Sequence, residues 1–113
     1  MVRSALRSTL FLLLLAFPLM GWADEAHWID VRTAEEYAAG HVSQAVNIPY
    51  EEISDRIGEV TTDKDALIYV YCRSGRRSGI AREALLEAGF SKVVNVGGLE
   101  EALKKAAQLA PGQ

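Results

Sequence analysis

Short apolar runs alternate with amphipathic segments along residues 28–109. The strongest run, Leu67–Tyr71, is apolar at almost every position, which is typical of a parallel strand covered on both faces. Shorter runs of the same kind predict strands over residues 28–31, 45–48 and 93–96. The spacing of these runs leaves room for a helix between most successive strands.

Apolar residues recur at helical spacing between the predicted strands. Thr33 and Glu36 form the capping-box pattern at the start of a short helix, and Gly40 is placed to end it. Longer helical segments are predicted over residues 50–57, 78–88 and 99–109. Strands that alternate with helices predict an α/β domain. We expect a mainly parallel sheet of four to five strands, flanked by helices on both faces.

The first 23 residues follow a different pattern. Two arginines precede an apolar run over residues 10–17, and small residues end the segment at Ala23. This arrangement predicts a secretory signal cleaved after Ala23, which leaves residues 24–113 as a single domain. The apolar run is shorter than the ~20 residues that a membrane span needs, and Pro18 follows it. We therefore expect no stable membrane insertion after cleavage.

The predicted mature chain is acidic. Without Arg3 and Arg7 it carries ten lysines and arginines against fifteen acidic residues, a net charge of −5. An acidic protein is a poor general ligand for nucleic acid, so no nucleic-acid partner is expected. Three of the ten basic residues nevertheless fall within five positions, at Arg73, Arg76 and Arg77. A local positive cluster on a negative protein indicates a small anionic ligand.

Cys72 is the single cysteine of the chain and directly follows the strongest predicted strand. In α/β sheets, ligands bind at the carboxyl ends of the strands. A helix that begins near Ser78 would direct its N-terminal partial charge toward the loop, and the arginines would add full charges. Gly75 allows the backbone to turn so that several N–H groups converge on one anion. Because neither His27 nor His41 is placed to act as its base, Cys72 is predicted to be a nucleophile activated by electrostatics.

Four motifs, in this order, resemble those of the single-domain rhodaneses, which are thiosulfate sulfurtransferases. They are Asp30-Val-Arg32 with Glu36-Tyr37 and Gly40-His41-Val42, Ala45-Val-Asn-Ile-Pro49, Cys72-Arg-Ser-Gly-Arg-Arg77, and Gly97-Gly98-Leu99. With its predicted export signal, the chain is similar to the small periplasmic rhodaneses of the phage-shock protein E type. The resemblance covers nearly all of residues 27–103, and it implies a rhodanese-like domain and a periplasmic location.

The resemblance also implies a ping-pong transfer of sulfur through Cys72. The thiolate would attack the outer sulfur of thiosulfate and release sulfite, and the Cys72 persulfide would pass its sulfur to cyanide or a thiol. Loop N–H groups would stabilise the persulfide, and arginines would hold the sulfonate oxygens. No cofactor is expected, and no metal, because the possible ligands lack metal-binding spacing. The implied substrate-binding residues are Arg73, Ser74, Gly75, Arg76 and Arg77.

Two other function classes stay open at this point. A cysteine phosphatase or arsenate reductase can share this fold but uses a longer C-x5-R loop. Here the position that this loop requires is occupied by Ser78, and the arginine ends a C-x4-R loop at Arg77. A sulfur carrier without turnover, or a redox-sensing module, would keep both Cys72 and the fold.

Several residues of the motifs are interpreted as structural. Asp30 and Arg32 are expected to form an internal charge pair or to support the loop. His41 is expected to be a turn or packing residue. Gly97 and Gly98 are expected to provide a tight turn from a strand to a helix.

Overall fold

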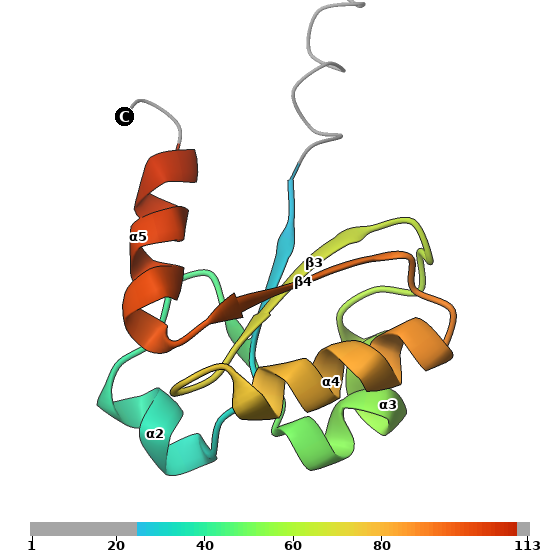
Figure 1. The fold of residues 1–113 in the computed structure, drawn as a ribbon, viewed down its shortest axis with the longest axis horizontal. Coiled ribbons are helices and arrows are strands. Elements are labelled where there is room, and N and C mark those ends of the chain that lie inside the picture. Colours follow the sequence, from blue (N-terminus) through green and yellow to red (C-terminus); the bar gives the residue numbers. More distant parts are fainter. Residues whose placement is uncertain (1–24, 111–113) are drawn as a thin grey trace, which may run out of the picture.

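The computed structural model of the chain describes residues 25–110, so the predicted signal over residues 1–23 lies outside the described part. Figure 1 shows a sheet at the centre of the domain. All strand pairs are parallel, and the strand order is β2-β1-β3-β4. The strands are β1 (His27–Asp30), β2 (Val46–Asn47), β3 (Leu67–Tyr71) and β4 (Lys92–Gly97). The prediction of a parallel sheet of four to five strands is confirmed, with four strands in the described part.

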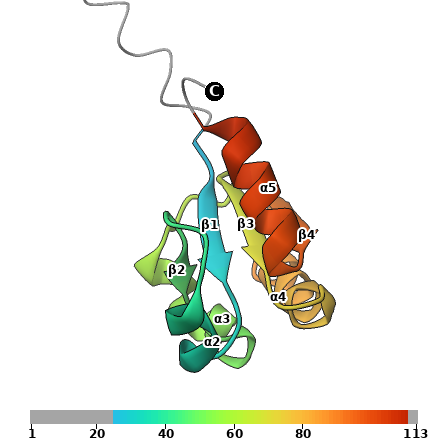
Figure 2. The same ribbon diagram turned by 90° about the vertical axis from the view of Figure 1, so that its left-hand side faces the viewer.

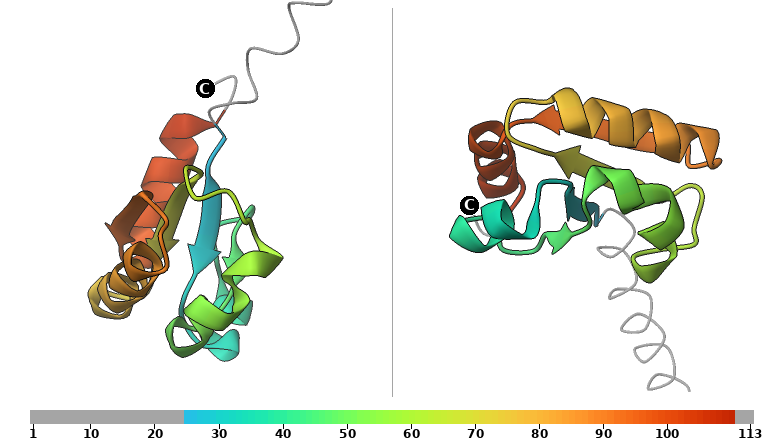
Figure 3. Two further views of the ribbon diagram at one scale, coloured as in Figure 1. Left: turned by 90° about the vertical axis from the view of Figure 1, so that its right-hand side faces the viewer. Right: turned by 90° about the horizontal axis from the view of Figure 1, so that it is seen from below.

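Helices cover both faces of this sheet, as predicted (Figures 2 and 3). The segments α3 (Ile53–Arg56) and α4 (Arg76–Glu87) cover one face, and α5 (Leu99–Leu109) covers the other. The short helix α2 (Ala34–Ala39) contributes Tyr37 to the core on the α5 side. Within residues 25–110, no helix combines the length and the apolar character that a membrane crossing requires.

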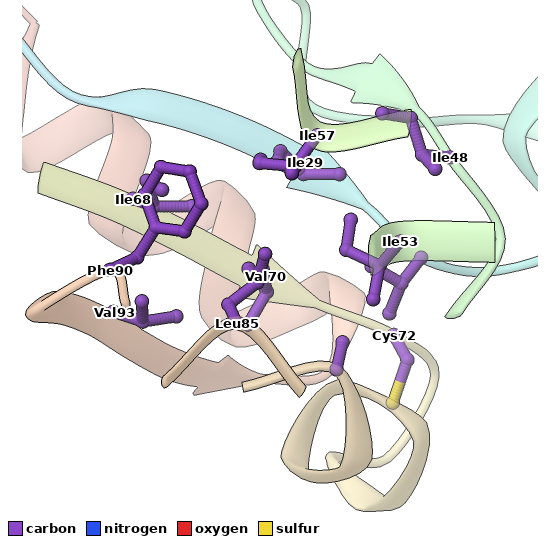
Figure 4. Close-up of a cluster of buried hydrophobic side chains, with 12 residues drawn as sticks. Ile29, Ile48, Ile53, Ile57, Ile68, Val70, Cys72, Leu85, Phe90 and Val93 are labelled. Carbon is purple, nitrogen blue, oxygen red and sulfur yellow. The ribbon is translucent and has the colours of Figure 1, made fainter. Parts of the chain in front are cut away.

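The two cores follow from the alternation of side chains along β3. Ile68 and Val70 belong to the core under α3 and α4, whereas Tyr69 and Tyr71 belong to the core under α5. Cys72 continues the alternation and joins the cluster that contains Ile68 and Val70 (Figure 4). The alternation along β3 therefore places the cysteine on the face of the sheet that α4 covers.

The helix predicted from residue 78 begins two residues earlier, at Arg76. Gly75 precedes it with a φ of 100°, in the left-handed region that favours glycine. Because the chain turns at Gly75, Arg76 and Arg77 lie in the first turn of α4 and not in the loop. The prediction of this boundary was wrong, because a positive φ at a helix start cannot be read from apolar periodicity.

The helix predicted over residues 50–57 is divided into three short turns. These are η2 (Tyr50–Glu52), α3 and η3 (Ile57–Glu59), of which the outer two are 3-10 helices. The backbone departs from regular helix at Glu52, with φ −106° and ψ 3°, and at Arg56, with φ −114° and ψ −1°. Ile53 and Ile57 still face the core, as their helical spacing predicted.

Candidate active site

The Cys72 sulfur lies beside the first turn of α4 (Figure 4). It accepts hydrogen bonds from the Gly75 N–H at 3.0 Å and the Ser78 N–H at 3.4 Å, and the Ser78 hydroxyl oxygen lies 3.3 Å away, within donating distance of a thiolate. Cys72 is 1% exposed and Ser78 is fully buried, so little water competes with these donors. The sulfur thus lies among donors suited to a negative charge.

These donors change the acidity of the thiol. Burial raises the pKa of Cys72, but hydrogen bonds from the Ser78 hydroxyl and from N–H groups outweigh burial and lower the pKa to about 7. The N–H groups belong to Ser78, Ser74 and Gly75. Short-range hydrogen bonds are therefore the leading cause of the lowered pKa, whereas the sequence had also suggested the arginine charges.

Arg77 is engaged by a carboxylate from another helix. Its Nη1 and Nη2 donate to Oε1 and Oε2 of Glu36, at 2.8 and 3.1 Å, in a bidentate ion pair. The same Glu36 Oε1 accepts from the Thr33 N–H at 3.0 Å, which completes the predicted capping box of α2. The Arg77 hydrogen bonds lead the causes that lower the pKa of Glu36 to about 2. Glu36 therefore connects α2 to the first turn of α4.

Arg73 and Arg76 differ from Arg77. Both are exposed, and within residues 25–110 neither takes part in an ion pair. Their guanidinium groups thus keep their donors available at the rim of the loop. Of the three clustered arginines, two are free for a ligand and one has an internal partner.

Asn95 of β4 is a neighbour of the site that sequence reasoning missed. Its Oδ1 accepts from the Ser78 hydroxyl at 2.7 Å, and its Nδ2 donates to the Gly75 carbonyl at 3.0 Å. The register of β3 and β4 pairs Asn95 with Val70, so Asn95 lies on the α4 face of the sheet. Only a known strand register could have indicated this neighbour, because Asn95 lies 17 residues beyond Ser78.

The turn after β4 packs directly against the loop after β3. The Cys72 N–H donates to the Gly97 carbonyl at 3.0 Å, and Gly97 has a φ of 110°. A Cβ on Gly98 would collide with the Arg73 carbonyl oxygen. Gly98 itself has an ordinary extended backbone, with φ −94° and ψ −178°, so space and not conformation requires glycine there. The predicted tight turn is confirmed, and it also supports the active loop.

Asp30 and Arg32 form the internal charge pair that the sequence suggested. Arg32 Nη2 lies 2.6 Å from Asp30 Oδ2 and also donates to the Gly40 carbonyl at 2.6 Å. The hydrogen bond to Asp30 leads the causes that raise the pKa of the buried Arg32. His41 stacks on Tyr37 with ring centroids 3.5 Å apart, which agrees with a packing role. These contacts hold together the chain that follows β1.

Comparison with protein families settles the relationship of the chain. The rhodanese-like domain family matches residues 19–105, which span most of the sequence. The chain belongs to the rhodanese-like family. A rhodanese-like domain with Cys72 at the end of its third strand thus agrees with the motifs found in the sequence.

Individual relatives of this rhodanese-like domain carry several names. It is 47% identical over 92 residues to the thiosulfate sulfurtransferase PspE of Escherichia coli strain K12, covering 81% of this chain and 88% of PspE. A solved structure described as a rhodanese with anions from E. coli superposes with a TM-score of 0.66 at 47% identity, covering 68% of this chain and 91% of that one. A putative sulfur carrier protein of Bacillus subtilis strain 168, YrkF, is 41% identical over 68 residues, which are 60% of this chain and 36% of YrkF.

The lowered pKa of Cys72 predicts a specific pH dependence. The rate of alkylation by iodoacetamide should rise as pH increases through about 7 and level off above it, because the thiolate is the reactive form. The low exposure of Cys72 slows alkylation at every pH, so the position of the inflection and not the absolute rate is the readout. Mass spectrometry after timed exposure measures this rate, and an inflection at about 8.5, the value of a free thiol, would contradict the prediction.

Replacing Gly98 by alanine should displace the active loop. The added methyl group meets the Arg73 carbonyl oxygen, which is a backbone atom and cannot move unless the loop shifts with it. We expect the alkylation rate of Cys72 at pH 8 to change by on the order of tenfold or more, because the sulfur loses its alignment with its donors. Gly58→Ala is the matched control, since no atom lies within 4 Å of a Cβ built there. Equal rates in the two variants would contradict a supporting role for the turn.

Proposed function

We propose that this rhodanese-like domain is a thiosulfate sulfurtransferase that works through a persulfide on Cys72. The Cys72 thiolate attacks the outer sulfur of thiosulfate, the sulfur–sulfur bond of the donor breaks, and sulfite leaves with the electron pair. A nucleophilic acceptor such as cyanide or a thiol then attacks the outer sulfur of the persulfide. That second step breaks the new sulfur–sulfur bond and returns the Cys72 thiolate, so the cycle needs no cofactor or metal.

The observation that carries this proposal is the set of donors around the Cys72 sulfur. Hydrogen bonds from Gly75 and Ser78 stabilise negative charge on the sulfur, both when Cys72 attacks and when it is the leaving group. The lowered pKa of about 7 keeps much of the thiol ionised near neutral pH. These properties suit a nucleophile that must form and release a sulfur–sulfur bond within one turnover.

Arg73 and Arg76 are the proposed contacts for the sulfonate oxygens of the donor. Both are exposed at the rim of the loop, and neither is used by an ion pair within residues 25–110. A guanidinium group can donate two parallel hydrogen bonds to such an anion. Donor contacts for Ser74 and Gly75 through their N–H groups, and for Arg77, stay predictions. Arg77 would first have to share its donors with Glu36.

The comparisons support sulfur transfer as the reaction class. The family match and the 47% identity to a protein named thiosulfate sulfurtransferase both favour it. We propose further that thiosulfate is the donor, that Cys72 carries a persulfide, and that cyanide or a thiol is the acceptor. We also propose that the protein acts in the periplasm, on the basis of the predicted signal over residues 1–23 and the resemblance to exported rhodaneses.

A second candidate function is that of a sulfur carrier. YrkF, which is named a putative sulfur carrier protein, matches 60% of this chain, and this similarity favours the carrier function. A carrier would form the same Cys72 persulfide but would transfer the sulfur only to a dedicated partner. Turnover with small acceptors therefore distinguishes the two functions.

The proposed mechanism predicts a mass change on Cys72. Purified protein treated with thiosulfate should gain about 32 Da, one sulfur atom, and cyanide should remove it as thiocyanate. Intact-mass spectrometry before and after each reagent measures both steps. Cys72→Ser should abolish the gain, because the hydroxyl cannot form a persulfide.

Each failure has a separate meaning. The absence of any gain in mass with thiosulfate would contradict thiosulfate as the donor. A stable gain that cyanide and small thiols do not remove would contradict turnover and favour the carrier function. An equal gain in Cys72→Ser would remove Cys72 from the mechanism.

Neutralising Arg73 or Arg76 should lower the catalytic efficiency with thiosulfate. We expect Arg73→Ala or Arg76→Ala to lower kcat/KM for thiosulfate by about tenfold, equivalent to ~1.4 kcal/mol for one charge-assisted contact. Lys104→Ala is the matched control, because it removes one exposed positive charge from α5 on the opposite face. A steady-state thiocyanate assay measures the effect. If neither arginine variant differs from the control, Arg73 and Arg76 do not bind the donor.

A further inference from the structure

Asn95 is held in one orientation by two backbone groups. Its Oδ1 accepts from the Gly97 N–H at 3.1 Å, and its Nδ2 donates to the Gly75 carbonyl at 3.0 Å. An N–H can only donate and a carbonyl can only accept, so a flip of the amide would lose both hydrogen bonds. The oxygen of Asn95 therefore faces Ser78.

This orientation decides where the Ser78 proton lies. Asn95 Oδ1 is an acceptor only, so the 2.7 Å contact requires that the Ser78 hydroxyl donates to it. The same hydroxyl lies 3.3 Å from the Cys72 sulfur and has a single proton. While that proton points toward Asn95 Oδ1, the Ser78 oxygen presents a lone pair to the sulfur. A lone pair can accept from a thiol but cannot stabilise a thiolate.

We propose that Asn95 is a positioning residue that draws the Ser78 hydroxyl proton away from the Cys72 sulfur and so favours the thiol over the thiolate. In the thiol, the S–H donates to Ser78 and Ser78 donates to Asn95. When the thiolate forms, the Ser78 proton turns to the sulfur, and Asn95 Oδ1 keeps the Gly97 N–H. Loss of Asn95 therefore costs the thiol a hydrogen bond and costs the thiolate much less.

This role has a chemical use for a sulfur-transfer nucleophile. A thiolate that is stabilised too strongly is a poorer nucleophile, and attack is fastest when the thiol pKa lies near the ambient pH. The N–H groups of the loop increase the acidity of Cys72, and Asn95 would limit that increase. The inference rests on the proposed function only in taking Cys72 as the nucleophile.

Titratable groups lie on each element around the site, and the test must leave them unchanged. Arg77 interacts electrostatically with Cys72 and is itself paired with Glu36 of α2. The titratable groups on these elements are Arg73 in the loop, Arg76 and Arg77 in α4, and Glu36 in α2. Tyr50 of η2 interacts with Arg77, and Glu101 of α5 accepts from the Gly98 N–H in the supporting turn. Substituting Asn95 by a neutral residue alters none of these charges.

The loop should keep its shape without Asn95. The Gly75 carbonyl also accepts from the Gly79 N–H at 3.0 Å, which is the first helical hydrogen bond of α4. Asn95 is exposed, so replacing it by alanine creates no buried cavity. The variant Asn95→Val, which suits a strand and also lacks the amide, repeats the test if Asn95→Ala does not fold.

The test is a double-mutant cycle read by the pH dependence of Cys72 alkylation. Asn95→Ala should lower the pKa of Cys72 by roughly half a unit, the scale of one partly solvated hydrogen bond. In a Ser78→Ala background the same substitution should leave the pKa unchanged, because Asn95 acts through the Ser78 hydroxyl. Val94→Ala, at an exposed position of the same strand, is the matched control and should also leave it unchanged. Thermal unfolding verifies that each variant is folded.

The outcomes separate a positioning role from a structural one. A lowered pKa that depends on Ser78 supports the proposal. An unchanged or raised pKa in Asn95→Ala overturns it, as does an equal shift in both backgrounds. Alkylation needs no sulfur donor. The pKa shift can therefore be interpreted even if the thiosulfate mechanism fails.

Discussion

The site depends on the contact between the loop after β3 and the glycine turn after β4. The Cys72 N–H is bonded to the Gly97 carbonyl, and Gly98 leaves no room for a side chain beside the Arg73 carbonyl. Because β3 and β4 are adjacent parallel strands, their carboxyl ends bring these two segments together. The loop is thus fixed by backbone contacts before any ligand arrives, and its N–H groups need no reorganisation to stabilise charge on sulfur.

The groups around Cys72 act on it at different distances. Hydrogen bonds from Gly75 and Ser78 act directly on the sulfur and lower its pKa. The exposed arginines lie at the rim, where solvent screens their charge and where an incoming anion would meet them first. Arg77 has a third role, because its ion pair with Glu36 joins α4 to α2. The C-x4-R pattern therefore combines a nucleophile with an arginine that has an internal partner.

Much of the fold could be predicted from local patterns. The capping box of Thr33 and Glu36 is present, and the last helix spans residues 99–109 as its periodicity indicated. The start of α4 could not be predicted in the same way, because it depends on the positive φ of Gly75. Two residues of difference there moved Arg76 and Arg77 from the loop into the helix.

The sequence by itself determined the succession of strands and helices along the chain and the family motifs that place Cys72 after the strongest strand. Side-chain periodicity and helix caps depend on neighbours within a few residues, so a single chain carries them. The tertiary structure alone decided that Glu36 holds Arg77, 41 residues away, and that Asn95 of β4 holds Ser78. Those contacts depend on strand order, strand register and the packing of helices on the sheet, which long-range burial sets and no local pattern contains.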